Sequence, residues 1–297
     1  MPKEVVVISG KGGTGKTSVV AAFAALAENM VMTDCDVDAA DLHLILQPQP
    51  NETHAYSGGK KARIQPELCA ACGKCAELCR FGAVTLTGPA NDSVKKTYVV
   101  DPISCEGCAV CVRYCPTEAI LFETSDDGEW FVSDTRYGPM VHAKLRAGRG
   151  TSGILVSAVR KKAQEIAKEG NYDLIISDGS PGIGCPVIAS LAGADLALAV
   201  TEPTLSGLHD LKRVAELAGH FEIPVAVVVN KFDLSQELTE QVEQWAESTG
   251  ARVVGRIPYD PVVTEAQMAG QSVVEFGDGN VAEELVSIWG RVCELLK

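Results

Sequence analysis

Apolar and polar positions follow two distinct patterns along this chain. Short runs made almost entirely of apolar residues predict buried strands, and longer stretches with apolar residues at every third or fourth position predict amphipathic helices. Strands are expected at 5–8, 31–36, 174–178, 225–229 and directly before 255, and helices at 18–28, 154–168 and 279–297. Strands that alternate with helices in this way favour an α/β fold, with a mostly parallel sheet and helices on both of its faces.

The alternation of strands and helices stops near residue 48 and resumes near residue 150. We therefore expect one large discontinuous domain formed by 1–60 and 146–297, with a small domain inserted at 61–124. The segment 125–145 has the pattern of a β-hairpin that returns the chain to the large domain, and the polar stretch 148–153 is expected to act as a hinge.

Composition narrows the class of protein. The 297 residues are 46% apolar, which is ample for a buried core, and the net charge of −13 disfavours a nucleic-acid surface, because phosphate binding draws on clustered Lys and Arg. The N-terminus lacks the pattern of a signal peptide, and no run reaches the roughly 18 apolar residues of a membrane span. Together with the many cysteines, this predicts a cytoplasmic protein that binds neither nucleic acid nor membrane.

Eight of the eleven cysteines occur in two copies of the spacing CxxCxxCxxxC, the second 36 residues after the first. Two-residue gaps let three thiolates surround one face of an iron-sulfur cubane, whereas zinc sites favour pairs of CxxC and disulfides belong to oxidising compartments. Zinc stays open as an alternative. The spacing resembles that of bacterial two-cluster ferredoxins, although Arg80 stands where their run has proline.

The ferredoxin resemblance implies that the inserted domain is a small α+β ferredoxin-like domain with two [4Fe-4S] clusters. In ferredoxins the fourth cysteine of each run binds the other cluster. The expected ligands are therefore Cys69, Cys72, Cys75 and Cys115 for the first cluster, and Cys105, Cys108, Cys111 and Cys79 for the second.

A phosphate-binding loop follows the first strand. The sequence from Gly10 to Thr17 satisfies GxxxxGK[ST], and it stands between a strand and a helix as that motif requires. Backbone amides of the loop would face phosphate oxygens, Lys16 would add positive charge, and Thr17 would reach Mg²⁺. The expected nucleotide-binding residues here are Gly10, Lys11, Gly12, Gly13, Thr14, Gly15, Lys16, Thr17 and Ser18.

Acidic residues end two of the later strands, at the sheet edge where the phosphate loop is expected. Asp178 follows a buried strand and is predicted to hold Mg²⁺, and the amide of Gly182 in the turn behind it is predicted to sense the γ-phosphate. Asp36 ends the second strand, and its carboxylate could orient water or Mg²⁺. Its acidic neighbours, Asp34, Asp38 and Asp41, fit turns or helix caps equally well.

Lys11 is a second lysine at the start of the loop, and the general motif does not require it. With this lysine, residues 11–17 resemble the deviant Walker A signature of the MinD-superfamily P-loop ATPases, which include the nitrogenase iron protein and the plasmid-partition ATPases. The resemblance implies that Lys11 reaches the nucleotide of a partner subunit in an ATP-bound homodimer or heterodimer, and that Asp36 positions the attacking water. A solvated surface lysine is the alternative.

The same resemblance places Asn230 against the nucleotide base and Pro258 and Tyr259 beside it. Residues 230–233, Asn-Lys-Phe-Asp, also fit the NKxD motif of GTPases, so GTP stays open beside ATP. Cys185 has the spacing from Asp178 of the cluster ligand in the nitrogenase iron protein, but this chain lacks that protein's second cysteine. A small buried thiol is therefore the expected role of Cys185.

The whole layout resembles the MinD-superfamily ATPases that carry an inserted ferredoxin domain. It implies an ATPase with catalytic Lys11, Lys16, Asp36 and Asp178, in which the nucleotide state is coupled to electron transfer to or from an unidentified redox or assembly partner. The implied cofactors are ATP, Mg²⁺ and two [4Fe-4S] clusters. Two alternatives stay open: an iron-sulfur cluster carrier or maturation ATPase, and a positioning ATPase of the cell-division kind whose clusters are redox sensors or structural elements.

Overall fold

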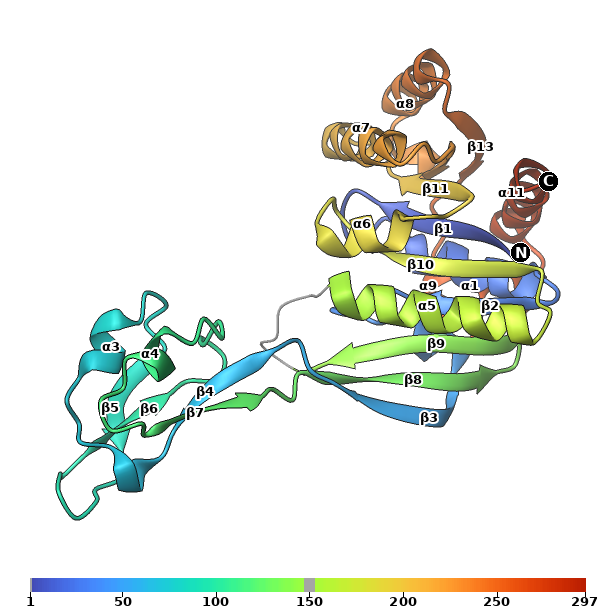
Figure 1. Cartoon of the computed structure of the whole chain (residues 1–297). Coiled ribbons are helices and arrows are strands. Elements are labelled where there is room, and N and C mark those ends of the chain that lie inside the picture. Colours follow the sequence, from blue (N-terminus) through green and yellow to red (C-terminus); the bar gives the residue numbers. More distant parts are fainter. Residues whose placement is uncertain (1, 147–152) are drawn as a thin grey trace. The chain divides into compact units, whose positions relative to one another are not determined.

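The computed structural model describes residues 2–146 and 153–297 and divides into two compact units (Figure 1). The first unit contains the described residues of 1–54, 129–144 and 151–297, and the second those of 55–128 and 145–150. The second unit thus interrupts the chain of the first. The hinge expected at 148–153 lies outside the described residues, except for Gly153.

A nine-stranded sheet forms the centre of the first unit, in the order β13-β12-β11-β1-β10-β2-β9-β8-β3. Its strands are β1 (Lys3–Ser9), β2 (Met30–Asp34), β3 (Gln49–Tyr56), β8 (Gly128–Thr135), β9 (Gly138–Leu145), β10 (Leu174–Pro181), β11 (Leu196–Thr201), β12 (Val225–Asn230) and β13 (Arg252–Ile257). All neighbouring pairs from β13 to β9 are parallel. The mostly parallel sheet and its five predicted strands are confirmed, and the strand expected before residue 255 continues to Ile257.

The segment 125–145 contributes two full strands to this sheet. β8 and β9 run in opposite directions (Figure 1), and β9 pairs in parallel with β2 through Met140 and Val141. Both side chains are completely buried. The segment is therefore part of the packed sheet, and β3, which precedes the second unit in the chain, lies at the edge beside β8.

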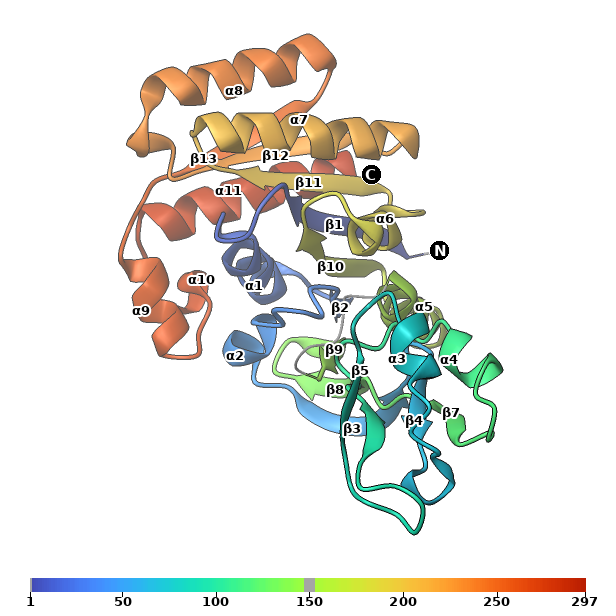
Figure 2. The same ribbon diagram turned by 90° about the vertical axis from the view of Figure 1, so that its left-hand side faces the viewer.

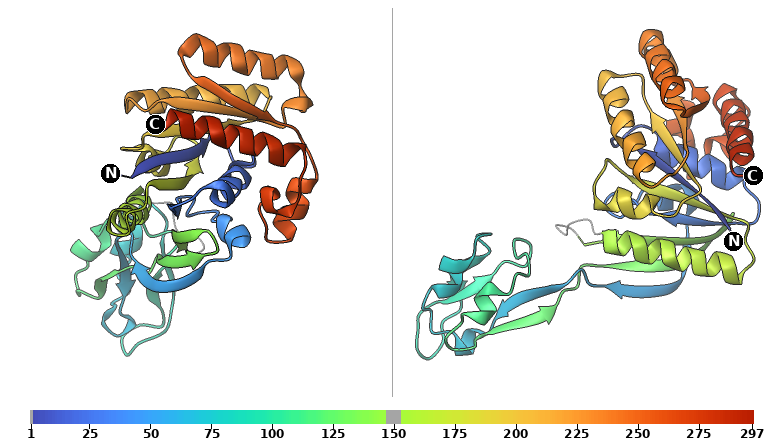
Figure 3. Two further views of the ribbon diagram at one scale, coloured as in Figure 1. Left: turned by 90° about the vertical axis from the view of Figure 1, so that its right-hand side faces the viewer. Right: turned by 45° about the horizontal axis from the view of Figure 1, so that its top comes forward.

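Helices cover both faces of the sheet, as expected (Figures 2 and 3). One face carries α1 (Lys16–Leu26), α2 (Leu42–Leu46), α9 (Val262–Met268), α10 (Val273–Phe276) and α11 (Asn280–Leu295), and the other carries α5 (Gly153–Glu169), α6 (Cys185–Leu191), α7 (Leu205–His220) and α8 (Gln236–Thr249). Strand β1 serves both faces, because Val5 and Val7 enter the core under α1 and α11, while Val6 and Ile8 enter the core under α7 and α8.

The three predicted helices are confirmed as α1, α5 and α11. The apolar side of α11, which includes Val281, Leu285, Ile288 and Val292, is buried in the core, so this helix docks on the body of the unit. Among the residues described, no helix combines the length and the apolar character needed to cross a bilayer.

A buried ion pair joins α5 to the middle of the sheet. Arg160 donates from Nε and Nη2 to the carboxylate of Glu4 at 2.9 and 2.7 Å, and from Nη1 to the carbonyl oxygens of Ala189 and Ala192 at the end of α6. The hydroxyl of Ser177, one residue before Asp178, also donates to Glu4 at 2.7 Å. Helices α5 and α6 are thereby fixed to the strands that present the acidic residues.

In its described residues the second unit contains two small antiparallel sheets and three short helices. Its elements are β4 (Lys60–Ile64), η1 (Pro66–Leu68), α3 (Lys74–Leu78), β5 (Val84–Gly88), β6 (Thr97–Val100), α4 (Val110–Arg113) and β7 (Ile120–Thr124). Strand β4 pairs with β7, and β5 pairs with β6. Its core is small, and apolar side chains such as Ile64, Val84 and Ile120 pack there against cysteines of both runs.

Candidate functional site

The loop between β1 and α1 has the backbone that a phosphate cradle needs. Gly13 and Gly15 have φ of 82° and 87°, in the left-handed region that favours glycine. A Cβ on Gly15 would lie 2.3 Å from Nδ2 of Asn230, so a larger residue cannot be placed there without displacing that side chain. The loop then enters α1, whose N-terminal amides form a favourable site for an anion.

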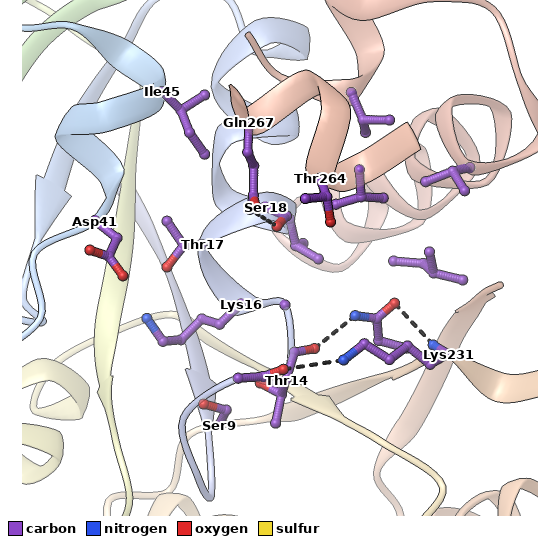
Figure 4. Close-up of a pocket in the computed structure, with 18 of the residues that line it drawn as sticks. Ser9, Thr14, Lys16, Thr17, Ser18, Asp41, Ile45, Lys231, Thr264 and Gln267 are labelled. Atoms are coloured by element: carbon purple, nitrogen blue, oxygen red, sulfur yellow. Dashed lines mark hydrogen bonds between the residues drawn. The ribbon is translucent and has the colours of Figure 1, made fainter. Parts of the chain in front are cut away.

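A cavity of about 550 Å³ opens beside this loop (Figure 4). Of the predicted site residues, it is lined by Gly12, Gly13, Thr14, Gly15, Lys16, Thr17, Ser18, Asp36, Asn230, Pro258 and Tyr259. Gly10, Lys11, Asp178 and Gly182 are not in its wall. Residues of α2, α9, α10 and α11, including Ile45, Thr264 and Gln267, also line it, and Gln267 donates to Ser18 at 2.8 Å (Figure 4). The cavity is thus polar at the loop and more apolar at its far end.

Lys16 lies among three carboxylates, of which Asp34 ends β2, Asp36 follows this strand and Asp178 lies within β10. Its Nζ donates to Asp178 and is 3.7 Å from the carboxylate of Asp36, and Thr17 donates to Asp178 at 2.9 Å. Lys16 and Asp178 are only 6% and 1% exposed. Burial by itself would lower the pKa of Lys16, but the negative charges of Asp178, Asp36 and Asp34 raise it, so Lys16 is cationic.

Among the residues described, these carboxylates outnumber the cation Lys16 that they face. Burial is the main cause that raises the pKa of Asp36 to about 6, with Asp178 adding to the rise and Lys16 opposing it. Burial and the neighbouring Asp178 raise the pKa of Asp34 well above its usual range. Asp34 accepts from the amide of Asp36 at 3.0 Å, while its Oδ2 has no hydrogen-bond partner within 2–146 and 153–297. This excess of negative charge favours a divalent cation beside Thr17 and Asp178.

Asp34 is the residue at this edge that sequence reasoning did not choose. Asp34 is one of four acidic residues near the end of the second strand. Its place inside that strand, ahead of the other three, was the signal that could have distinguished it from them. The parallel register pairs Asp34 with Asp178, and Asp34 is fully buried for that reason. A carboxylate at the last buried position of a strand is held by the sheet, whereas those that follow belong to the loop.

The turn after Asp178 is closed in this structure. β10 continues to Pro181, and the Gly182 amide donates to the carbonyl of Ser9 at 2.9 Å. The predicted contact of this amide with a γ-phosphate therefore requires that bond to open. A Cβ on Gly179 would lie 2.8 Å from the Val7 carbonyl, so β1 and the turn pack closely.

Lys11 points to a neighbour outside the cavity wall. Its Nζ is 3.3 Å from the carboxylate of Glu202 and 3.4 Å from the hydroxyl of Ser206. Lys231 also binds Glu202, and although burial opposes the shift, these two lysines lower the pKa of Glu202. Glu202 is thus a partner of Lys11 that the sequence analysis did not identify.

Cysteines of both runs lie close together in the core of the second unit. One hollow is lined by Cys69, Cys72, Cys75 and Cys115 together. Burial raises the pKa of Cys111, and the charges of Cys105, Cys108 and Cys79 act on the same thiol. All eight cysteines are free thiols. Among the residues described, no trio of His, Cys, Asp or Glu side chains is placed to hold a single metal ion.

The backbone repeats between the two cysteine runs. Left-handed residues stand at Ala71 and Gly73 in the first run and 36 residues later at Gly107 and Ala109 in the second. The pair formed by Gly82 and Glu118 has the same offset. Each run thus turns inward in the same way, and a short helix, α3 or α4, follows directly on the second left-handed residue.

The three remaining cysteines lie in the first unit. Cys35 is buried, and burial raises its pKa to about 12, while burial also raises the pKa of the half-buried Cys293. Cys185 begins α6 and is exposed, so the expectation that it is a buried thiol is wrong. The turn before α6 leaves Cys185, the first residue of this helix, at the surface.

Comparison with known proteins adds a family and a fold. A family model of the CobQ/CobB/MinD/ParA nucleotide binding domain matches residues 5–273. The chain is 31% identical over 234 residues to an uncharacterized protein, MJ0578, of Methanocaldococcus jannaschii, and the match covers 77% of this chain and 78% of that protein. It is also 24% identical over 157 residues to the light-independent protochlorophyllide reductase iron-sulfur ATP-binding protein of Chlorobium phaeobacteroides. This match covers 50% of this chain and 57% of that protein.

Among solved structures, the fold is similar to that of the septum site-determining protein MinD of Pyrococcus horikoshii, complexed with Mg-ADP. The TM-score is 0.60 with 17% identity, and the superposition covers 99% of this chain and 97% of that chain. At this identity the likeness concerns the fold alone.

Proposed function

The chain belongs to the CobQ/CobB/MinD/ParA nucleotide-binding domain family, and from this premise we propose that it is an ATP-hydrolysing iron-sulfur protein. In this proposal its nucleotide state is coupled to two [4Fe-4S] clusters that exchange electrons with a partner protein. The observation that carries the proposal is the packing of cysteines from both runs in the core of a unit that is inserted in the chain between Asp36 and Asp178.

Nucleotide chemistry is assigned to the residues around Lys16. Phosphate oxygens in the cavity would give Lys16 a new partner and release Asp178, which with Thr17 would then hold Mg²⁺ through oxygen ligands. Bound Mg²⁺ would neutralise charge on the phosphates. Asp36, whose pKa is about 6, is mostly ionised at neutral pH and is therefore able to orient water and accept its proton.

Iron-sulfur chemistry is assigned to the second unit. Eight thiols form a soft donor set that suits iron-sulfur clusters, and two-residue spacings allow three thiols of each run to face one cluster. When bound, such clusters supply one-electron transfer. The relative from Chlorobium carries iron-sulfur and ATP binding in its name, which supports this assignment.

Coupling is proposed from the path of the chain. The chain leaves the first unit through β3 and returns through β8, and both strands belong to the sheet that also holds Asp36 and Asp178 at its edge. We propose that ATP binding favours a homodimer or a heterodimer with a related ATPase, to which Lys11 contributes once it leaves Glu202. The electron partner is a separate redox or assembly protein.

The test uses the full chain purified without oxygen. About eight iron atoms per chain are expected, with loss of about half in Cys72→Ser and in Cys108→Ser, one exposed cysteine from each group, and no loss in the matched exposed control Cys185→Ser. ATP hydrolysis is expected in the wild type and in Cys185→Ser but not in Lys16→Ala. Zinc in place of iron, or equal hydrolysis by Lys16→Ala, would overturn the proposal. Release of iron to an apoferredoxin would instead support the carrier alternative.

A further inference from the structure

The segment that follows β12 has the N-K-x-D spacing that GTPases use to read guanine. To read guanine, the aspartate carboxylate must face the base inside the pocket and accept from its ring N–H and its amino group. Here one oxygen is already engaged, because the backbone amide of Tyr259 donates to Oδ1 of Asp233 at 2.7 Å. Asp233 is exposed and is absent from the residues that line the cavity, whereas Pro258 and Tyr259 line it.

The other two polar residues of the segment are also bonded to the protein. Asn230 donates from Nδ2 to the Thr14 carbonyl at 2.7 Å, and its Oδ1 accepts from the Lys231 amide at 3.0 Å. Lys231 reaches the Gly13 carbonyl at 3.4 Å and also binds Glu202. Figure 4 shows this group of bonds between Lys231 and the loop at Thr14. One end of the segment therefore fixes the phosphate loop.

The other end of the segment is fixed to β13. Phe232 begins the short turn η2 (Phe232–Leu234), and its ring lies 5.8 Å from the guanidinium carbon of Arg256. Arg256 stands on β13 directly before the wall residues 258–259, and it binds Glu243 of α8 through both oxygens. This contact between Phe232 and Arg256 holds the turn close to β13, and Asp233 in the turn accepts from the backbone of Tyr259.

We propose that Asp233 is a positioning residue that holds the Pro258–Tyr259 wall of the cavity, and that the 230–233 segment braces this wall against the phosphate loop without reading guanine. The assignment rests on the proposed nucleotide binding. The ligand is a nucleoside triphosphate whose base lies along this wall and is not selected through the Asp233 carboxylate. The affinity for the nucleotide then depends on whether the side chain of residue 233 accepts a hydrogen bond from the Tyr259 amide, and not on the charge of that side chain.

Two substitutions separate positioning from base reading. Asp233→Asn keeps an oxygen that accepts from the Tyr259 amide, so its affinity for ATP is expected within about twofold of the wild type. Asp233→Ala leaves that amide without its acceptor and frees the wall, so the Michaelis constant for ATP is expected to rise about tenfold with an unchanged turnover number. A base-reading aspartate behaves differently, because its change to asparagine exchanges the guanine preference for xanthine, whose ring presents an acceptor where guanine has an amino group.

The experiment measures displacement of a fluorescent ATP analogue by ATP, GTP and XTP from the wild type and both variants, followed by steady-state ATP hydrolysis. The expected result is that Asp233→Asn binds ATP about as well as the wild type and that Asp233→Ala binds it more weakly. A gain of XTP binding with a loss of GTP binding in Asp233→Asn would overturn the assignment, as would wild-type affinity in a folded Asp233→Ala. If Asp233→Ala does not fold, Asp233→Asn alone still decides between positioning and base reading. Failure of the wild type to bind any of the three nucleotides is a separate result, and it contradicts the proposed function.

Discussion

The buried pair of Glu4 and Arg160 offers a prediction whose size follows from its contacts. In Arg160→Met the Glu4 carboxylate would keep Ser177 and Gln164 as partners but lose both guanidinium hydrogen bonds, and two carbonyls at the end of α6 would lose their donor. The side chains of Glu4 and Arg160 are 4% and 5% exposed, so water cannot replace these bonds. Removal of one partner from such a buried pair costs about 3–5 kcal/mol.

Urea unfolding followed by circular dichroism measures this loss. Arg160→Met is expected to lower the free energy of unfolding by about 3–5 kcal/mol, and the double variant Glu4→Leu/Arg160→Met is expected to be more stable than Arg160→Met alone, because no unpaired charge remains buried. Lys3→Met is the matched control, since the pair of Lys3 with Asp195 is exposed and contributes at most about 1 kcal/mol.

A loss below about 1 kcal/mol in Arg160→Met would refute this reasoning, because it would mean that the carboxylate of Glu4 finds other partners or is hydrated. The result bears on function as well, since Ser177 donates to Glu4 directly before Asp178. Arg160→Met is therefore expected to disorder the edge that presents Asp178.

Three further predictions concern the nucleotide site. Asp36 has a pKa of about 6, so ATP turnover is expected to fall as the pH drops from 7 to 5, and the low residual turnover of Asp36→Asn should lack this acid limb. Because this pKa lies above the usual value, protonation of Asp36 favours the folded state, and a loss of activity at low pH that coincides with thermal unfolding would contradict the assignment. Gly15→Ala places a Cβ 2.3 Å from Asn230 at a residue with φ of 87°, so its affinity for ATP, measured by calorimetry, should fall on the order of 100-fold. The control Gly290→Ala, whose Cβ would meet nothing within 4 Å, should bind ATP like the wild type, and equal affinities of the two variants would contradict the role of the loop. Lys11→Ala should abolish an ATP-dependent dimer in light scattering while the monomer still binds ATP, and persistence of that dimer would show that Lys11 has no role between subunits.

Local signals in the sequence predicted most of the candidate site residues, and many of these line the cavity beside the phosphate loop. The glycine spacing of residues 10–17 predicted a loop that the structure places between β1 and α1, because the motif needs only a strand, a turn and a helix adjacent in the chain. The cysteine spacing likewise predicted that Cys69, Cys72 and Cys75 lie together, and they line one hollow with Cys115, because these three are close in sequence. Such short-range patterns determine local geometry directly.

The features that sequence reasoning missed depend on contacts between distant segments. Strands β8 and β9 join the sheet beside β2, and this register follows from long-range pairing. Glu202 contacts Lys11 because the chain after β11 passes beside the phosphate loop. Asp34 is buried in the sheet, where β10 pairs with β2 and places Asp178 opposite Asp34. Nothing in the spacing of these residues predicts those neighbours.

The central claim, that nucleotide controls the clusters, is tested most directly by an anaerobic redox titration of the full chain with and without MgATP. Wild-type protein is expected to show a nucleotide-dependent shift in the reduction potential of its clusters or in their rate of electron exchange with a small redox protein. Lys16→Ala, which keeps all eight cysteines but loses the lysine that faces Asp178, is expected to show no such change. Potentials and exchange rates that are the same with and without MgATP in the wild type would contradict the claim.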